Sequence, residues 1–329
     1  MGGVTTANTN VIDYWNMSSA GNAIDFGDLS VTRKTGSACS SRTRAIYGGG
    51  TTGSESNVLD YVTIASTGNA TDFGDLTVAR RQLGATSNDT RGCWFGGFTG
   101  ADSNVIDYVT IATTGNATDF GDLARAEFTK YGAGSPTRAI GMGGAYNGGG
   151  NYSNTIEYFT FATTGNAFSF GTLASNRVAP AVFSSSVRCV SAGGALDGGG
   201  FTDDAEYVTI ATLGNATKYG DITTSTYFPS GTSNSITGFH SGGYAPNTST
   251  RVNTIYSISI ANGGTATNFG TLTESVSEIG DGASESHGGL DEEALTSTNS
   301  SFGQGILLIA GGYVGARQNT IDHFDLTTK

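Results

Sequence analysis

Apolar and polar residues alternate with a period of two along much of the chain, and the segment VIDYVTI at 105–111 is typical. A period of two indicates a β-strand, and apolar residues occur in both alternating sets, so we expect both faces of this strand to be covered. One set is Val105, Asp107, Val109 and Ile111, and the other is Ile106, Tyr108 and Thr110.

Turn-forming residues separate the alternating runs. The residues TTGNA at 113–117 supply Gly and Asn, which tolerate positive φ, and therefore predict a β-hairpin turn. A pair of glycines at 96–97 ends the run before this strand. The resulting unit has four predicted strands, at 81–87, 91–97, 104–113 and 117–123.

This unit repeats along the chain. The phrase NVLDYVTIASTGNATDFGDL at 57–76 returns almost unchanged at 104–123. Weaker copies begin at Asn10, Asn154, Asp204 and Asn253, and a truncated copy begins at Asn319. Successive copies are separated by 47, 47, 50, 49, 50 and 66 residues, and a period near 48 is that of a propeller blade. We predict an all-β propeller of four-stranded antiparallel blades, forming a single domain over residues 1–329.

Several features of the repeat resemble the kelch family. Kelch repeats have an Arg that opens the first strand, Gly-Gly at the end of the second, an aromatic residue in the third and a Trp in the fourth. This chain has Arg33, Arg80 and Arg177 at the first of these places, and a phenylalanine or tyrosine in place of the Trp. Gly-Gly pairs lie at 49–50, 96–97, 143–144, 193–194, 242–243 and 311–312, and the third-strand aromatics are Tyr14, Tyr61, Tyr108, Tyr158 and Tyr207.

The ring must have a seam, because the third-strand motif occurs seven times while the other strands occur six times. In a six-bladed ring, which we favour over seven blades, the last blade takes strands from both termini and leaves no exposed edge. The surplus third strand could instead reach another subunit, so a homo-oligomer is left open.

Composition limits the functional classes. Glycine accounts for 51 residues and proline for 4, which suits short strands joined by tight turns. The net charge of −12 disfavours binding to nucleic acid or anionic lipid. Residues 273–299, predicted to be an acidic insertion loop, contain seven of the acids and no Lys or Arg. The N-terminus has no signal-peptide pattern and no apolar run is long enough to span a membrane, so we expect a protein made in a cytoplasm.

The titratable residues offer little catalytic pattern. The histidines, His240, His287 and His323, are expected to pack rather than react, and the scattered cysteines, Cys39, Cys93 and Cys189, to be buried. The DxxD pairs of the repeats, such as Asp72 and Asp75, supply too few oxygens for calcium and are interpreted as turn-forming residues. Repeated arginines could bind an anion, or they could pair with an acid such as Asp89 or cap exposed carbonyls, and we favour a structural role; they are Arg44, Arg91, Arg138 and Arg188. We predict no catalytic residue, no metal and no cofactor.

The loops after Gly-Gly vary between repeats, whereas the TGNA turn is nearly constant. Propeller topology places these loops, which join second and third strands, on one face together with the fourth-to-first connections, so we expect binding there. Aromatic rings among Asn, Asp and Gly suit sugars, although several rings could simply cover the next blade. The candidate ligand or partner residues are Phe98, Tyr146, Tyr152, Phe201, Tyr244 and Tyr313.

The sequence VTIATTGNATDFGDL at 109–123 resembles repeat proteins of tailed-phage virions, particularly those of phages that infect marine cyanobacteria. This resemblance implies a non-enzymatic structural or recognition protein of the virion, either a capsid decoration or a tail-fibre module. Its expected partners are other virion proteins and a host surface glycan or receptor, without nucleic acid or membrane insertion. The alternatives are a cell-surface lectin or adhesin and a propeller glycosidase or lyase.

Overall fold

The computed structural model describes residues 1–290, 306–313 and 317–325. These residues form β-strands and one short 3-10 helix, η1 (Asn147–Gly149), with no α-helix among them. The prediction of an all-β chain is therefore confirmed for the described part.

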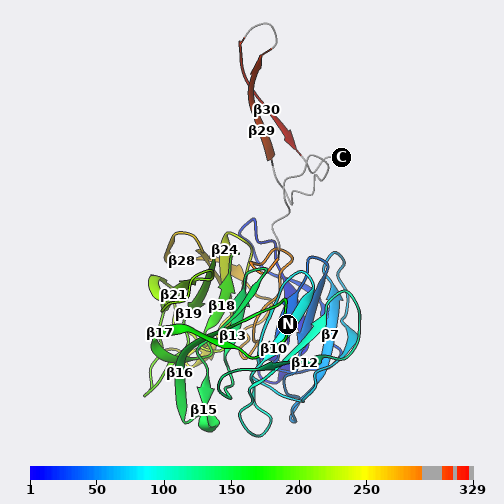
Figure 1. The fold of residues 1–329 in the computed structure, drawn as a ribbon, viewed down its shortest axis with the longest axis vertical. Helices are drawn as coiled ribbons and strands as arrows, with labels where there is room; N and C mark the ends of the chain where they lie inside the picture. The colour runs from blue at the N-terminus through cyan, green and yellow to red at the C-terminus, as the bar shows by residue number, and fades with distance from the viewer. Residues whose placement is uncertain (291–305, 314–316, 326–329) are drawn as a thin grey trace. The chain divides into compact units, whose positions relative to one another are not determined.

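Five sets of four antiparallel strands, which we call sheets 1 to 5, follow one another along the chain (Figure 1). Sheet 1 contains β5 (Ser37–Ser40), β6 (Arg44–Gly48), β7 (Val58–Thr63) and β8 (Thr71–Asp75). Sheet 2 contains β9 (Gly84–Ser87), β10 (Arg91–Phe95), β11 (Val105–Thr110) and β12 (Thr118–Asp122). Sheet 3 contains β13 (Tyr131–Gly134), β14 (Arg138–Met142), β16 (Asn151–Thr160) and β17 (Phe168–Val178).

Sheets 4 and 5 have the same organisation. Sheet 4 contains β18 (Ala181–Ser184), β19 (Arg188–Ala192), β21 (Asp204–Thr209) and β22 (Thr217–Asp221). Sheet 5 contains β23 (Ser230–Ser233), β24 (Thr237–Ser241), β27 (Thr254–Ser259) and β28 (Gly263–Thr271). A short parallel pairing of β22 with β28 joins these two into one eight-stranded sheet. Near the N-terminus, β3 (Val11–Tyr14) and β4 (Ile24–Asp28) form a separate hairpin that matches the third and fourth strands of a sheet.

The remaining strands of residues 1–290 are two residues long and lie in connections. They are β1 (Gly3–Val4), β2 (Asn8–Thr9), β15 (Ala145–Tyr146), β20 (Ala195–Leu196), β25 (Tyr244–Ala245) and β26 (Thr250–Arg251).

The first strands of the five sheets, which we call the inner strands, pack against one another in chain order. Figure 1 accordingly shows β13 and β18 toward the middle of their unit and β7 and β17 toward its edges. Residues 278–284, which we call the closing segment, lie between the last inner strand and the first. The Gly282 N–H donates to the carbonyl oxygen of Gly231 (2.7 Å), and the Ala38 N–H donates to that of Asp281 (3.0 Å). The closing segment is thus hydrogen-bonded to the inner strands of both sheet 5 and sheet 1.

Six equivalent backbone positions mark this arrangement. Just before each inner strand, and in the closing segment, one residue other than glycine has φ between 51° and 58°; these are Thr35, Gln82, Thr129, Ala179, Phe228 and Glu278. Backbone N–H to carbonyl bonds connect them from Thr35 to Glu278, Gln82 to Thr35, Thr129 to Gln82, Phe228 to Ala179 and Glu278 to Phe228. Glu278 therefore links the last sheet to the first.

The apolar cores lie between neighbouring sheets. Trp94, for example, is fully buried with residues of sheets 1 and 2, and its indole N–H donates to the Ser37 carbonyl oxygen (3.0 Å). Between the β3–β4 hairpin and sheet 1, Ile12 and Phe26 pack with Tyr47. Both faces of a strand are covered in this way, as the sequence pattern predicts.

Contacts within the chain divide it into two units, residues 1–291 and 292–329. In the second unit, β29 (Ile306–Tyr313) and β30 (Arg317–Asp325) form an antiparallel hairpin. The prediction of one domain over 1–329 stays a prediction. The predicted acidic loop at 273–299 continues beyond the described residues, and its described part includes the buried side chains of Val276, Asp281 and Leu290.

A glycine in each fourth strand lies against a glycine of the next sheet. A Cβ on Gly74, where φ is +143°, would lie 2.4 Å from the carbonyl oxygen of Gly115. We expect Gly74→Ala to destabilise the protein by about 2 kcal/mol or more in urea unfolding, because backbone would have to move. The control is Gly115→Ala, since Gly115 has a similar φ of +155° but open space around its Cβ position. Equal losses in the two variants would show that this contact does not limit the side chain.

Candidate binding faces and the central pocket

Loops lie on two opposite faces of the unit formed by residues 1–290, and different contacts hold them in place on each face. On one face, the TGNA turns connect the third and fourth strands. The Asn116 Oδ1 accepts a hydrogen bond from the Asp75 N–H (3.1 Å), and the Ala117 N–H donates to the Asp75 carbonyl oxygen (2.7 Å). The same Asn contact recurs at Asn22, Asn69, Asn166 and Asn215. These turns therefore join neighbouring sheets at five places.

The repeated arginines of the second strands act in the same way. The Arg44 guanidinium donates to the carbonyl oxygens of Ile111 (3.1 Å) and Ala112 (2.9 Å) in the next sheet, and lies over the ring of Tyr61. Arg91, Arg138 and Arg188 make equivalent contacts. The predicted structural role of these arginines is confirmed, and of its two forms the structure shows the capping of carbonyl oxygens.

The arginines that open the first strands are buried in ion pairs. Arg80 contacts Asp107 at 2.8 Å, and the two side chains are fully buried. Arg33 with Asp60 and Arg177 with Glu206 repeat this pair. In sheet 3 Glu127 takes the place of the arginine, and the cation comes from Lys130, whose ammonium lies 2.9 Å from Glu127 and 3.5 Å from Glu157, the acid of the third strand.

On the other face, the loops between second and third strands meet the fourth-to-first connections. Phe201 stacks on Tyr227 with ring centroids 5.2 Å apart and an interplanar angle of 28°. Tyr244 meets the same Tyr227 ring edge-on at 5.4 Å. Phe201 remains 37% exposed. Three connections thus bring their aromatic rings together, and we call Phe201, Tyr227 and Tyr244 the aromatic cluster.

The other candidate residues of this face lie in separate contacts. Phe98 packs edge-on against Phe128, Tyr146 lies beneath the Arg125 guanidinium, and Tyr152 packs against a core cluster. The side chain of Tyr313 lies outside the described residues. Of the six candidates, the structure brings Phe201 and Tyr244 together through Tyr227, which the sequence analysis missed. The sequence feature that could have indicated Tyr227 is the pair of adjacent aromatic residues at 227–228, which lies in a fourth-to-first connection of this face.

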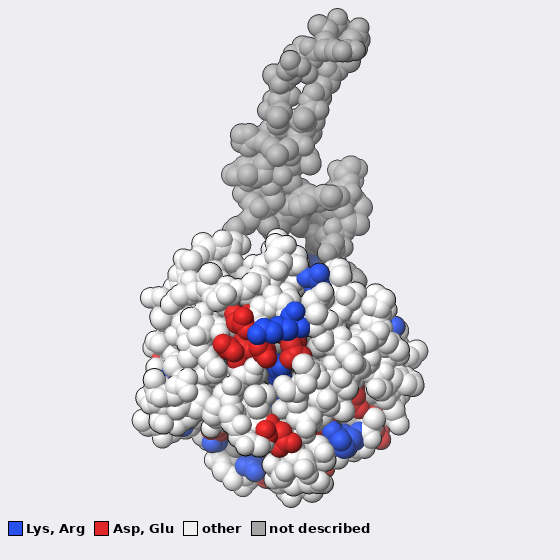
Figure 2. Space-filling model, turned by 90° about the vertical axis from the view of Figure 1, so that its left-hand side faces the viewer, with Lys and Arg blue, Asp and Glu red and all other residues white. Residues whose placement is uncertain are grey.

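Charged groups are sparse on the surface. Figure 2 shows them gathered in small clusters of both signs, with an uncharged surface between them. One group joins Asp203, Asp204 and Asp221, whose oxygens lie close enough to hold a cation. The Lys218 ammonium already lies 2.5 Å from Asp204 and 2.7 Å from Asp221. This lysine neutralises part of the acidic charge.

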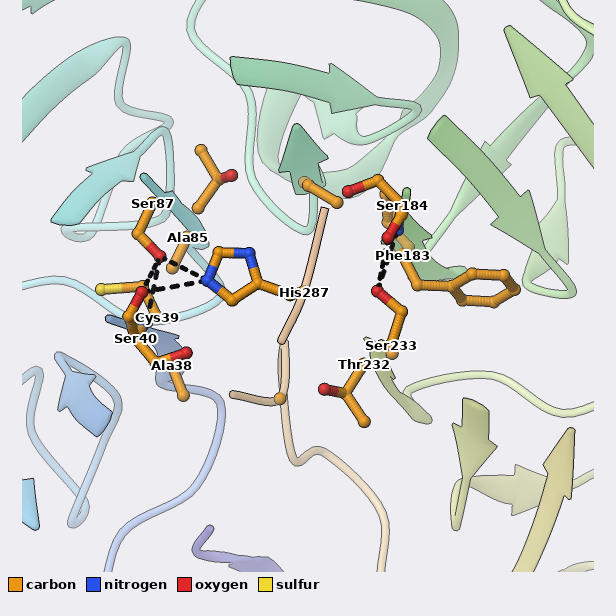
Figure 3. A pocket seen from close by; sticks show the side chains of 16 residues that line it. Ala38, Cys39, Ser40, Ala85, Ser87, Phe183, Ser184, Thr232, Ser233 and His287 are labelled. Atoms are coloured by element: carbon orange, nitrogen blue, oxygen red, sulfur yellow. Dashed lines mark hydrogen bonds between the residues drawn. The ribbon is translucent and has the colours of Figure 1, made fainter. Parts of the chain in front are cut away.

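A small central pocket lies among the inner strands (Figure 3). Its volume is about 30 Å³, enough for roughly one or two water molecules. His287 projects into it, and its Nε2 lies 3.0 Å from the Ser40 carbonyl oxygen and 3.2 Å from the Ser87 hydroxyl. The Gly289 N–H donates to Nδ1, which places the imidazole proton on Nε2. Burial lowers the pKa of His287, which favours this neutral form.

Asp281 of the closing segment lies next to this pocket and is 4% exposed. Its Oδ2 accepts hydrogen bonds from the Ala85 N–H (3.0 Å), the Gly132 N–H (3.3 Å) and the Ser37 hydroxyl (3.0 Å). Its Oδ1 has no partner among the described residues. Burial outweighs these donors and raises the pKa of Asp281 to about 8.

The remaining titratable candidates are enclosed in the fold. Burial lowers the pKa of His240 to about 4, and its Nε2 lies 3.0 Å from the Thr226 hydroxyl. The side chain of His323 lies outside the described residues. The cysteines are buried and unpaired, as predicted.

Within the described residues, no helix is both long and apolar enough to cross a membrane. Comparison with known proteins finds no matching family model and no matching curated protein.

Proposed function

We propose that residues 1–290 form a six-bladed β-propeller with kelch-like blades. Support comes from the six equivalent positive-φ positions and from the closing segment, which is hydrogen-bonded to sheets 1 and 5. The β3–β4 hairpin supplies the outer strands of the sixth blade. Each blade then packs between two neighbours, so both of its faces are covered, which accounts for the alternating pattern.

We further propose that the chain is a non-enzymatic recognition protein of a tailed-phage virion. The observation that supports a role in recognition is the aromatic cluster. Its rings come from three variable connections, and Phe201 remains partly exposed. A flat, partly exposed ring on a rigid support favours stacking against a sugar of a host surface glycan. The virion setting rests on the resemblance of the TGNA repeats to virion proteins.

The test uses two antibody fragments against purified particles of a tailed phage whose genome encodes this chain. One fragment is raised against the loop 197–203, beside the aromatic cluster, and the other against the turn 113–117 on the opposite face. We expect the first fragment to label the particle and to block its adsorption to host cells. The second fragment should label particles without an equal effect on adsorption.

The position of the label separates the two virion roles. Label at the tail tip supports a tail-fibre module, and label over the head supports a decoration protein that attaches to host surfaces. Particles without this chain would contradict the virion proposal and favour a cell-surface lectin. Labelled particles whose adsorption neither fragment changes would contradict recognition through the aromatic cluster.

A further inference from the structure

The aromatic cluster continues into a short row of residues that are paired through their backbones. Tyr227 pairs with Tyr244 through two N–H to carbonyl bonds (3.1 and 2.9 Å), and Tyr244 pairs with Arg251 where β25 meets β26. Directly opposed residues of antiparallel segments have side chains on the same side, with Cβ atoms about 5 Å apart. Since Phe201 stacks on Tyr227, the row adds one cation, Arg251, to the aromatic cluster.

The Arg251 side chain is partly exposed and close to the rings. Burial raises the pKa of Tyr227, and the positive charge of Arg251 acts against this rise, so the guanidinium lies near that phenol. The Arg251 Nε donates to the Ser277 hydroxyl (3.1 Å). Its two terminal nitrogens make no hydrogen bond or ion pair within the described residues. They are therefore available to a group outside the chain.

Arg251 differs in this respect from the other cations of residues 1–290. Each of the others contacts a carboxylate or a backbone carbonyl oxygen. The equivalent rows of sheets 1 and 2 end in acids, Glu55 and Asp102. Glu55 lies 3.7 Å from Arg81, and Asp102 accepts a hydrogen bond from the Gly148 N–H (3.3 Å). These acids have partners in the fold, whereas Arg251 has no counter-charge there.

Two acids near the aromatic cluster are already paired with lysines. The Glu278 carboxylate lies 2.7 Å from the Lys34 ammonium, and Asp204, three residues after Phe201, lies 2.5 Å from the Lys218 ammonium. These pairs reduce the repulsion that an incoming carboxylate would meet, although the net charge of the chain is −12.

We infer that Arg251 and the aromatic cluster together bind a glycan that contains an acidic sugar. The carboxylate of this sugar accepts two parallel hydrogen bonds from the planar Arg251 guanidinium, and a ring of the same glycan stacks on Phe201. The inference rests on the proposed role in glycan recognition and adds the class of sugar. It follows from Arg251 being a cation without a counter-charge beside exposed aromatic surface.

The test measures binding of the full chain to envelope polysaccharide purified from host cells, in native form and after chemical reduction of its carboxyl groups to alcohols. We expect reduction to weaken binding of the parent about tenfold or more, because a hydrogen-bonded charge pair is lost. Arg251→Gln should weaken binding to the native form by a similar factor and remove the difference between the two forms. Arg251→Lys, which keeps the charge but not the paired donors, should lie between these limits.

Two further variants serve as controls. Arg81→Gln is the matched one, because Arg81 lies over the Phe98 ring of the same face but has Glu55 as its counter-ion. It should bind both forms as the parent does. Phe201→Ser tests recognition through the aromatic cluster and should weaken binding to both forms. Urea unfolding of each variant establishes that it is folded.

The outcomes separate this inference from the function on which it depends. A loss in Phe201→Ser without a loss in Arg251→Gln rejects the acidic sugar and keeps recognition through the aromatic cluster. No loss in either variant, or no binding by the parent, rejects glycan recognition by this cluster. Binding that depends on Arg251 but survives reduction of the carboxyl groups contradicts a carboxylate and indicates a sulfate or phosphate ester, which this reduction leaves intact.

Discussion

Replacing Asp107 by Ala is expected to lower the free energy of unfolding by about 3 to 5 kcal/mol, because it leaves the buried Arg80 guanidinium without its counter-ion. The two side chains are 0% exposed and 2.8 Å apart. Arg80 also donates to the carbonyl oxygens of Val105 (2.8 Å) and Trp94 (3.2 Å), which cannot neutralise its charge. Urea unfolding followed by tryptophan fluorescence, to which Trp94, fully buried in the same sheet, contributes, measures the loss.

The chain offers a matched control at Asp13, which has the position of Asp107 in the β3–β4 hairpin. Asp13 accepts hydrogen bonds from the Thr273 N–H (3.0 Å) and hydroxyl (2.7 Å) in a solvent-exposed setting. Asp13→Ala should therefore cost only about 1 kcal/mol. If both variants lose the same stability, the buried ion pair is not what makes this position important.

The repeat pattern was sufficient to predict strands and their order. The four predicted strands of the unit at 81–123 correspond to β9, β10, β11 and β12. Two bounds differ by three residues: the first strand is predicted to start at 81 and is observed from Gly84, and the third is predicted to end at 113 and ends at Thr110. Gln82 adopts φ of 54° and bonds to Thr35 of the preceding sheet, which interrupts the extended backbone. The alternation of apolar and polar residues within one strand does not indicate a contact with another sheet.

Contacts between repeats were harder to predict, because each partner lies about one period away in sequence. The TGNA turn was predicted as a hairpin, but its Asn116 also bonds to Asp75 of the preceding sheet. Tyr227 was missed because its role depends on rings from two other loops. The closing segment was interpreted as part of an acidic loop, although GDGAS at 280–284 resembles GSACS at 36–40, where β5 lies.

The surroundings of Asp281 make its ionisation costly. Its raised pKa of about 8 reflects burial that three donors to Oδ2 only partly offset. The neighbouring titratable groups are Cys39, Cys189 and Tyr131, and burial raises the pKa of each. None of them acquires compensating positive charge between pH 5 and pH 8. An ionised Asp281 would therefore be an unpaired buried charge at the meeting point of the inner strands.

Asp281→Asn is expected to remove this pH-dependent cost. In the unfolded chain an Asp titrates near pH 4, whereas folded Asp281 titrates near pH 8, so its protonated form stabilises the fold below pH 4 and that stability is lost as the pH rises to 8. Unfolding free energies measured from pH 5 to pH 8 should show the variant gaining about 1.4 kcal/mol per pH unit over the parent, roughly 4 kcal/mol in all. His240, His287 and the Met1 amine, whose pKa values burial lowers, act in the opposite direction in both proteins and cancel in this difference. A constant difference across this range would mean that Asp281 is already ionised in the folded protein, and its unpartnered Oδ1 would then require a buried cation or water molecule.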